Sequence, residues 1–114
     1  MQTDLQISFH NVDHSDAVDA SIRTEADKLD KVYDRITACR VAVEAPHRHQ
    51  HKGKLYRVRV DLVVPGAELI AARNPSAHGA HTDIHIAVRD AFRAARRQLQ
   101  DHTRRRRGPT GAAQ

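Results

Sequence analysis

The chain has 114 residues, a formal net charge of +5 and a single cysteine, so we expect one domain and no disulfide framework. No apolar run reaches the roughly 18 residues of a membrane span, and the first residues lack a basic and then apolar leader. These features disfavour secretion and membrane insertion. The net positive charge fits an anionic partner, but it also fits a solvated basic surface with no partner. Charge alone does not define a binding site, so it favours the first only weakly.

The charges are unevenly distributed along the chain. Residues 1–34 contain eight acidic and three basic residues, whereas residues 35–81 and 82–114 each contain eight basic and three acidic ones. The basic surplus therefore belongs to the central segment and the C-terminal segment, as in the electrostatic footprint of a nucleic-acid-binding protein.

Alternation of apolar and polar residues begins at Leu5 and predicts a half-buried first strand. Ser15 is a good N-cap, with Asp16 and Asp19 in the positively polarised first turn. Apolar residues then recur at helical spacing, which predicts a helix over about residues 16–34.

Three further strands and a second helix follow. Alternation predicts strands around residues 39–44 and 56–64, and Pro65-Gly66 is a tight-turn signal leading to a strand at about 67–73. Thr82 or Asp83 is expected to cap the second helix. We expect an α+β domain over residues 1–103 and a basic, disordered tail over residues 104–114.

The element order β-α-β-β-β-α predicts a two-layer sandwich, in which a four-stranded sheet carries two helices on one face. A strand–helix–strand start implies a parallel crossover, and the remaining strands form an antiparallel meander.

The second helix carries a row of arginines opposite its apolar stripe. At 100° per residue, Arg89, Arg93 and Arg96 fall within about 60° of one another, and Arg97 lies beside them. The planar guanidinium suits phosphate, and such a row can follow a nucleic-acid backbone. The alternative is a solvated helix face. The full set of candidate RNA-binding residues is Lys28, Lys31, Arg89, Arg93, Arg96, Arg97, Arg104 and Arg105.

The two flanks of the first helix differ in charge. Asp16, Asp19, Asp27, Asp30 and Asp34 gather on one flank, and Lys28 and Lys31 on the other. If the lysine flank borders the second helix, the basic strip spans both helices, but the sequence leaves this arrangement open.

Two clusters of histidines raise the question of a metal site. His47, His49 and His51 share a polar loop, and His78, His81 and His85 gather near the second helix, but neither group has the spacing of a structural zinc motif. We therefore expect no metal and no cofactor. A histidine-dependent metalloprotein or hydrolase remains an alternative.

Nucleophilic catalysis is also not expected. Cys39 falls on the inward phase of its strand, where a thiol acts as a small hydrophobe, and no glycine-rich phosphate loop or nucleophile elbow occurs. The chain has only two Phe and two Tyr, mostly in core phase. This disfavours base stacking on the sheet and favours recognition of phosphate and shape by the helices.

Several short motifs occur in order along residues 4–103: Asn11-Val12, Lys28-Leu29, Tyr33-Asp34-Arg35-Ile36, Gly53-Lys54, Val64-Pro65-Gly66, Asp83, Ala87, Ala91-Phe92 and Arg97-Gln98-Leu99. Together they resemble the ribosome hibernation-promoting factor family, which includes ribosome-associated translation inhibitors and is also called the sigma-54 modulation protein family. The chain resembles its short form.

The resemblance implies a fold like that of a double-stranded-RNA-binding domain and a cytoplasmic, non-enzymatic protein. It implies binding to the small ribosomal subunit and its ribosomal RNA, which blocks mRNA and tRNA and inhibits translation in stress or stationary phase. It implies no membrane or small-molecule partner, and a monomer off the ribosome. The alternative is a protein-interaction module that modulates a sigma factor.

Overall fold

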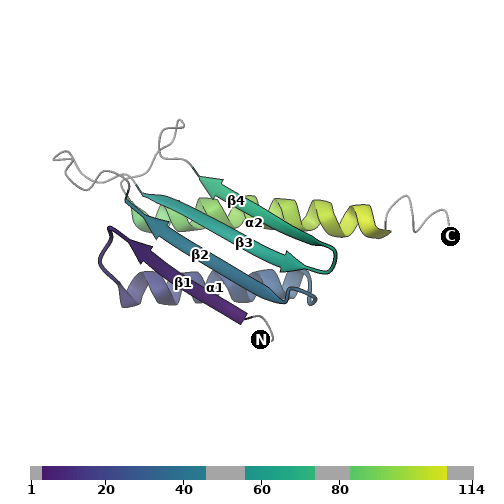
Figure 1. Cartoon of the computed structure of the whole chain (residues 1–114), viewed down its shortest axis with the longest axis horizontal. Coiled ribbons are helices and arrows are strands. Elements are labelled where there is room, and N and C mark those ends of the chain that lie inside the picture. The colour runs from purple at the N-terminus through teal and green to yellow at the C-terminus, as the bar shows by residue number, and fades with distance from the viewer. Residues whose placement is uncertain (1–3, 46–55, 74–82, 108–114) are drawn as a thin grey trace.

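The computed structural model describes residues 4–45, 56–73 and 83–107 (Figure 1). The predicted order of strands and helices is confirmed. The elements are β1 Asp4–His10, α1 Asp16–Val32, β2 Ala38–Glu44, β3 Arg57–Val64, β4 Ala67–Arg73 and α2 Ile84–Arg107.

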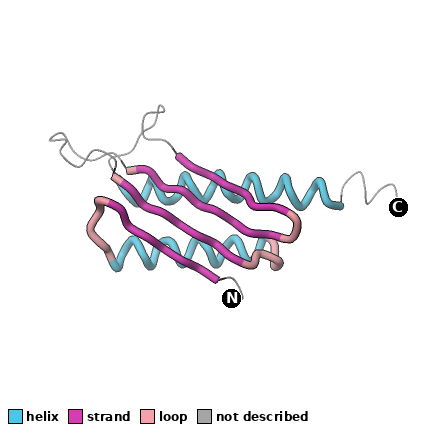
Figure 2. Tube along the Cα trace, in the orientation of Figure 1, coloured by secondary structure: helices cyan, strands magenta, loops and turns pink. Residues whose placement is uncertain are grey.

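The sheet has the strand order β1-β2-β3-β4. β1 pairs in parallel with β2, and the other two pairings are antiparallel. Both helices cover the same face of the sheet (Figure 2). The α+β two-layer sandwich is therefore confirmed, and none of the described residues forms a helix on the second face of the sheet.

The start and end of α1 follow from local hydrogen bonds. Ser15 has an extended backbone, and its Oγ accepts from the Val18 N–H at 3.3 Å. Tyr33 is again extended, and its N–H donates to the Leu29 carbonyl oxygen at 3.1 Å. α1 therefore ends at Val32, two residues before the predicted end.

α2 is longer than the sequence predicted. Asp83 caps it, since its Oδ1 accepts from the N–H groups of His85 at 2.8 Å and Ile86 at 3.4 Å, whereas Thr82 lies outside the described residues. The helix continues to Arg107, so the prediction that a disordered tail begins at residue 104 is wrong for its first four residues. Arginine is a good helix former, and cations are favoured at a helix C-terminus.

The core lies between the inner face of the sheet and the two helices. Ile22 of α1, Leu62 of β3 and Leu99 of α2 are fully buried within it. At the edge of the sheet, Gln98 Nε2 donates to the Ile70 carbonyl oxygen at 2.7 Å. These contacts fix how α2 is rotated about its axis, and so decide which of its side chains face outward.

Candidate nucleic-acid interface

The arginines of α2 lie on its exposed side, as predicted. Arg89, Arg93, Arg96 and Arg97 are all exposed. The opposite side of the helix is buried against the sheet through Val88, Ala91, Phe92, Ala95 and Leu99. The arginines can therefore contact a partner without any change in the core.

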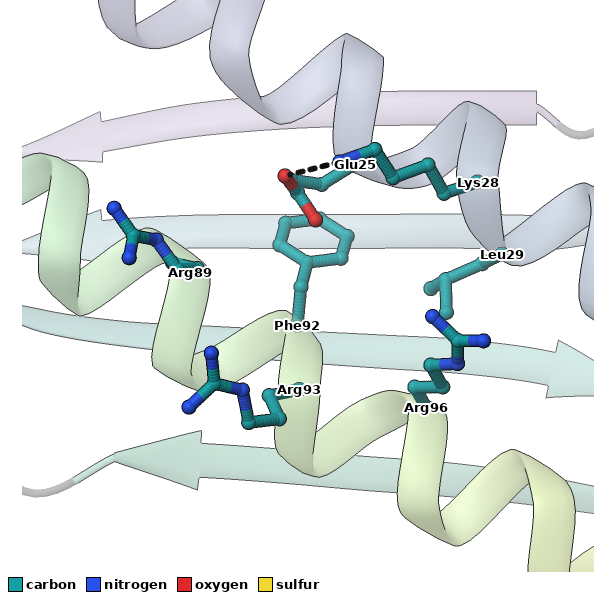
Figure 3. Close-up of a pocket in the computed structure, with 7 residues that line it drawn as sticks. All are labelled: Glu25, Lys28, Leu29, Arg89, Phe92, Arg93 and Arg96. Atoms are coloured by element: carbon teal, nitrogen blue, oxygen red, sulfur yellow. Dashed lines mark hydrogen bonds and ion pairs between the residues drawn. The ribbon is translucent and has the colours of Figure 1, made fainter.

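A groove of about 270 Å³ runs between the two helices (Figure 3). We call it the interhelix groove, and its lining residues are Glu25, Lys28 and Leu29 of α1 and Arg89, Phe92, Arg93 and Arg96 of α2. Leu29 and Phe92 are 3% and 2% exposed and form its apolar floor. The lysine flank of α1 therefore does border α2 at Lys28, which the sequence left open.

The other four candidate residues lie outside this groove. Lys31 is exposed, and its Nζ lies 4.0 Å from an Asp27 carboxylate oxygen. Arg97 lines a neighbouring hollow together with Asp90, Arg93 and Ala94. Arg104 and Arg105 are exposed near the end of α2, which extends past the β3–β4 hairpin (Figure 1).

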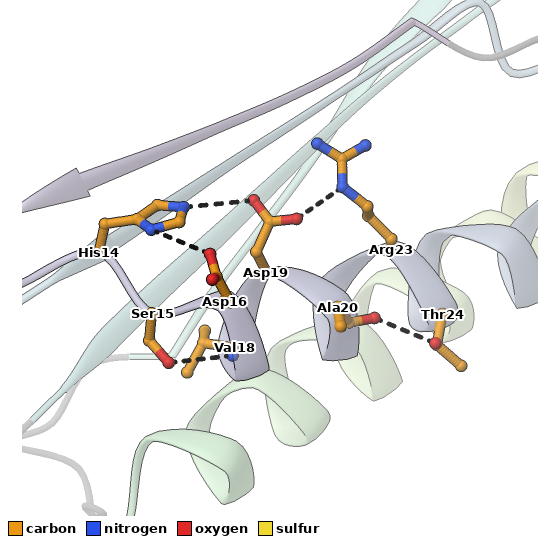
Figure 4. A network of polar contacts seen from close by, with 8 residues as sticks. All are labelled: His14, Ser15, Asp16, Val18, Asp19, Ala20, Arg23 and Thr24. Atoms are coloured by element: carbon orange, nitrogen blue, oxygen red, sulfur yellow. Dashed lines mark hydrogen bonds and ion pairs between the residues drawn. The ribbon is translucent and has the colours of Figure 1, made fainter.

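Cations on α1 are matched by carboxylates of the same helix. Arg23 Nε lies 2.6 Å from Asp19, and Lys28 Nζ lies 3.3 Å from Glu25. At the start of the helix, His14 contacts both Asp16 and Asp19 (Figure 4). α1 therefore contributes little unmatched positive charge.

α2 differs from α1 in this respect. Within the described residues, the guanidinium groups of Arg89, Arg93, Arg96 and Arg97 form no ion pair. An anion can bind these groups without first displacing a carboxylate. Of the two helices, α2 therefore carries most of the positive charge that has no carboxylate partner within the described residues.

The outer face of the sheet is the other surface with several arginines. Arg40 pairs with Glu68 at 3.8 Å, Arg57 with Glu44 at 3.7 Å and Arg59 with Asp61 at 2.9 Å. The hydrogen bond and charge of Asp61 raise the pKa of Arg59 above its ordinary value. Because each of these guanidinium groups has a carboxylate partner, the interhelix groove is the stronger candidate for binding an anion.

Glu25 is the lining residue that sequence reasoning missed. It lies three residues before Lys28, and positions so spaced share one helix flank, which is the signal that could have found it. Its side chain is 24% exposed. The groove thus combines four cations with one carboxylate.

Cys39 is 1% exposed, which confirms its predicted place in the core. Burial, with smaller contributions from the charges of Asp30 and Asp61, raises the pKa of its thiol to about 12. The protonated thiol is a poor nucleophile, because the thiolate is the reactive form.

The described ranges show neither a metal site nor a membrane span. They contain no group of three or more His, Cys, Asp or Glu residues able to hold a metal ion. The histidines of the two sequence clusters at positions 47, 49, 51, 78 and 81 lie outside these ranges. No helix in the described part of the chain is long and apolar enough to cross a membrane.

The chain is a two-layer α+β protein with a basic groove between its helices, and sequence comparison specifies its family. Residues 5–107 match the family described as "Sigma 54 modulation protein / S30EA ribosomal protein". The chain belongs to this family. No curated protein matches the sequence.

Two solved structures share the fold. A ribosomal subunit interface protein from Coxiella burnetii has a TM-score of 0.69 and 16% identity, over 87% of this chain and 96% of that one. The N-terminal domain of Thermus thermophilus Protein Y has a TM-score of 0.67 and 14% identity, over 87% of this chain and 98% of that one. At these identities the likeness establishes the fold alone.

The raised pKa of Cys39 predicts a specific dependence of stability on pH. The unfolded chain loses the thiol proton above the ordinary pKa of 9.0, whereas the native protein keeps it up to about 12. Between these values the unfolded state binds fewer protons, so stability falls as pH rises, and below pH 9 the thiol has no effect.

Urea unfolding of wild type and Cys39→Ala at pH 7.5 and pH 10 measures this effect. Between pH 7.5 and pH 10 the free energy of unfolding of the wild type should fall by about 1.4 kcal/mol more than that of the variant. The reason is that pH 10 lies one unit above the thiol pKa of the unfolded chain, and one pH unit corresponds to about 1.4 kcal/mol. The variant is the control for every other effect of pH on stability, because the two proteins differ only at residue 39. An equal loss in the two proteins would contradict the assignment.

Proposed function

We propose that this protein is a ribosome-associated hibernation factor that acts in the cytoplasm. It binds the RNA of the small ribosomal subunit through the interhelix groove and the neighbouring arginines of α2. Bound there, it blocks mRNA and tRNA and inhibits translation in stress or stationary phase. Off the ribosome it is a monomer, and it needs no cofactor, metal, membrane or small-molecule substrate.

The observation that carries this proposal is the set of unmatched guanidinium groups beside the groove. Arg89, Arg93 and Arg96 line it together with Lys28. Guanidinium groups bind phosphate oxygens through two parallel hydrogen bonds, and contacts of this kind release the counterions of a nucleic acid. A ribosomal RNA surface supplies phosphates at high density.

Family membership supports the ribosome as the target. The family description includes a ribosomal protein, and one structural relative is named as a ribosomal subunit interface protein. The surface also fits RNA better than a sigma factor. The buried centre of a protein–protein interface is mostly apolar. In the described part of the chain the exposed large hydrophobic residue is Ile70, which lies on the opposite side of the sheet from the groove.

Neutralising two groove arginines should abolish function without unfolding the protein. Arg93→Gln with Arg96→Gln removes two charge-assisted contacts, each worth on the order of 1.5–3 kcal/mol. We expect at least about a hundredfold loss of affinity for small subunits, measured by co-sedimentation, and loss of translation inhibition in vitro.

Arg40→Gln with Arg57→Gln is the matched control, since it removes the same charge from the outer face of the sheet. Both double variants should retain the wild-type circular dichroism spectrum, because exposed ion pairs contribute about 0–1 kcal/mol each. Strong binding by the groove variant together with weak binding by the sheet variant would place the site on the sheet and contradict the proposal.

Binding should also weaken steeply with salt. Three phosphate contacts, made by Arg89, Arg93 and Arg96, predict a slope of about −2 when log affinity is plotted against log salt concentration, using about −0.7 per contact for single strands. Titrations of small subunits between low and physiological salt measure the slope. The Arg93→Gln, Arg96→Gln variant should give about a third of this value, and a flat response in the wild type would exclude phosphate recognition.

A further inference from the structure

Glu25 places a negative charge inside a groove that otherwise attracts anions. Its Oε2 accepts from Lys28 Nζ at 3.3 Å, and it lines the groove together with Phe92 (Figure 3). With its side chain 24% exposed, the carboxylate is only partly screened by water. A phosphate at this point would be repelled, because like charges in contact interact unfavourably.

The groove therefore has two chemically distinct parts. Arg89, Arg93 and Arg96 offer donors for phosphate along its α2 side. Its centre offers an acceptor, Glu25, above an apolar floor made by Leu29 and Phe92. A group that fits this centre is flat, uncharged and rich in hydrogen-bond donors. Unpaired bases of RNA have these properties, and proteins read them through their Watson–Crick edges.

The four bases differ in how well they match a carboxylate. Guanine presents two adjacent donors, N1–H and the N2 amino group, which can bond the two carboxylate oxygens together. Adenine and cytosine each present one amino donor beside an acceptor nitrogen, and uracil presents one donor between two carbonyl groups. Their acceptors would face the carboxylate, which has no proton to donate when ionised. Glu25 thus selects guanine.

We propose that the interhelix groove holds one unpaired guanine of the bound RNA, whose N1–H and N2 amino group donate to Glu25. Arg89, Arg93 and Arg96 hold the phosphates on either side, and Lys28 orients the carboxylate. The groove volume of about 270 Å³ is near the lower end of ligand pockets, about 300–1,000 Å³, as expected for a single base. This inference rests on the proposed function and names the RNA feature that the site recognises.

Chemical probing of small subunits with kethoxal tests the contact directly, since the reagent modifies guanine at N1 and N2. Three proteins are compared at saturating concentration: wild type, Glu25→Gln and Asp27→Asn. Glu25→Gln keeps the size of the side chain but turns an amide donor toward the guanine donors. Asp27→Asn makes the same change of charge on α1 outside the groove, where Asp27 lies 4.0 Å from Lys31.

At least one unpaired guanine should react at least about tenfold more slowly with kethoxal when wild-type protein is bound, because the bidentate contact covers N1 and N2, the atoms that the reagent attacks. The fraction of Glu25→Gln that co-sediments with the subunit should give no such protection, and bound Asp27→Asn should retain it.

The outcomes separate the inference from the proposed function. Co-sedimentation of wild type without any guanine protection, or protection that persists in bound Glu25→Gln, would overturn the guanine contact and leave ribosome binding intact. Absence of wild-type co-sedimentation would overturn ribosome binding itself.

Discussion

Packing of the apolar stripe of α2 against the sheet determines how the rest of the molecule is arranged. Val88, Phe92 and Leu99 are buried, and their burial supplies the hydrophobic free energy that holds the helix in one rotation about its axis. That rotation directs the arginines away from the sheet. α1 packs on the same face and contacts α2, so the groove between the helices is a consequence of how the core is filled.

Cations on two surfaces of the protein are paired with carboxylates, whereas in the part of the chain that the structure describes those of the interhelix groove on α2 are not, and this difference favours the groove for binding anions. The arginines on the outer face of the sheet and the cations of α1 have carboxylate partners. Binding a phosphate at those sites would break an existing ion pair, so the net gain in binding free energy is small. The groove arginines of α2 have no such partner within the described residues, and their gain on binding phosphate is correspondingly larger. The negative charge of Glu25 then limits where phosphate can lie and favours a neutral donor at the centre.

Periodicity predicted the architecture well, because each strand and helix buries one face and therefore alternates or repeats in sequence. The extent of α2 was underestimated, since its last turns extend past the hairpin and carry no apolar pattern to mark them. Which flank of α1 borders α2 depends on how the helix docks on the sheet, and no local pattern encodes this. Lys28 and Lys31 are about 60° apart on the helix and share one flank, but only Lys28 reaches the groove. Glu25 was missed because the groove that it lines is completed by residues of α2 that are distant in sequence, such as Arg89 and Phe92.

The orientation of the protein on the small ribosomal subunit is the most direct test of the central claim that the helical side carries the RNA contacts. A cryo-electron microscopy map of the complex would determine it. We expect the interhelix groove and the α2 arginines to face ribosomal RNA, with Arg93 and Arg96 at phosphate groups and the outer face of the sheet directed away. A map in which the outer face of the sheet lies on the RNA and the groove is open to solvent would contradict the claim.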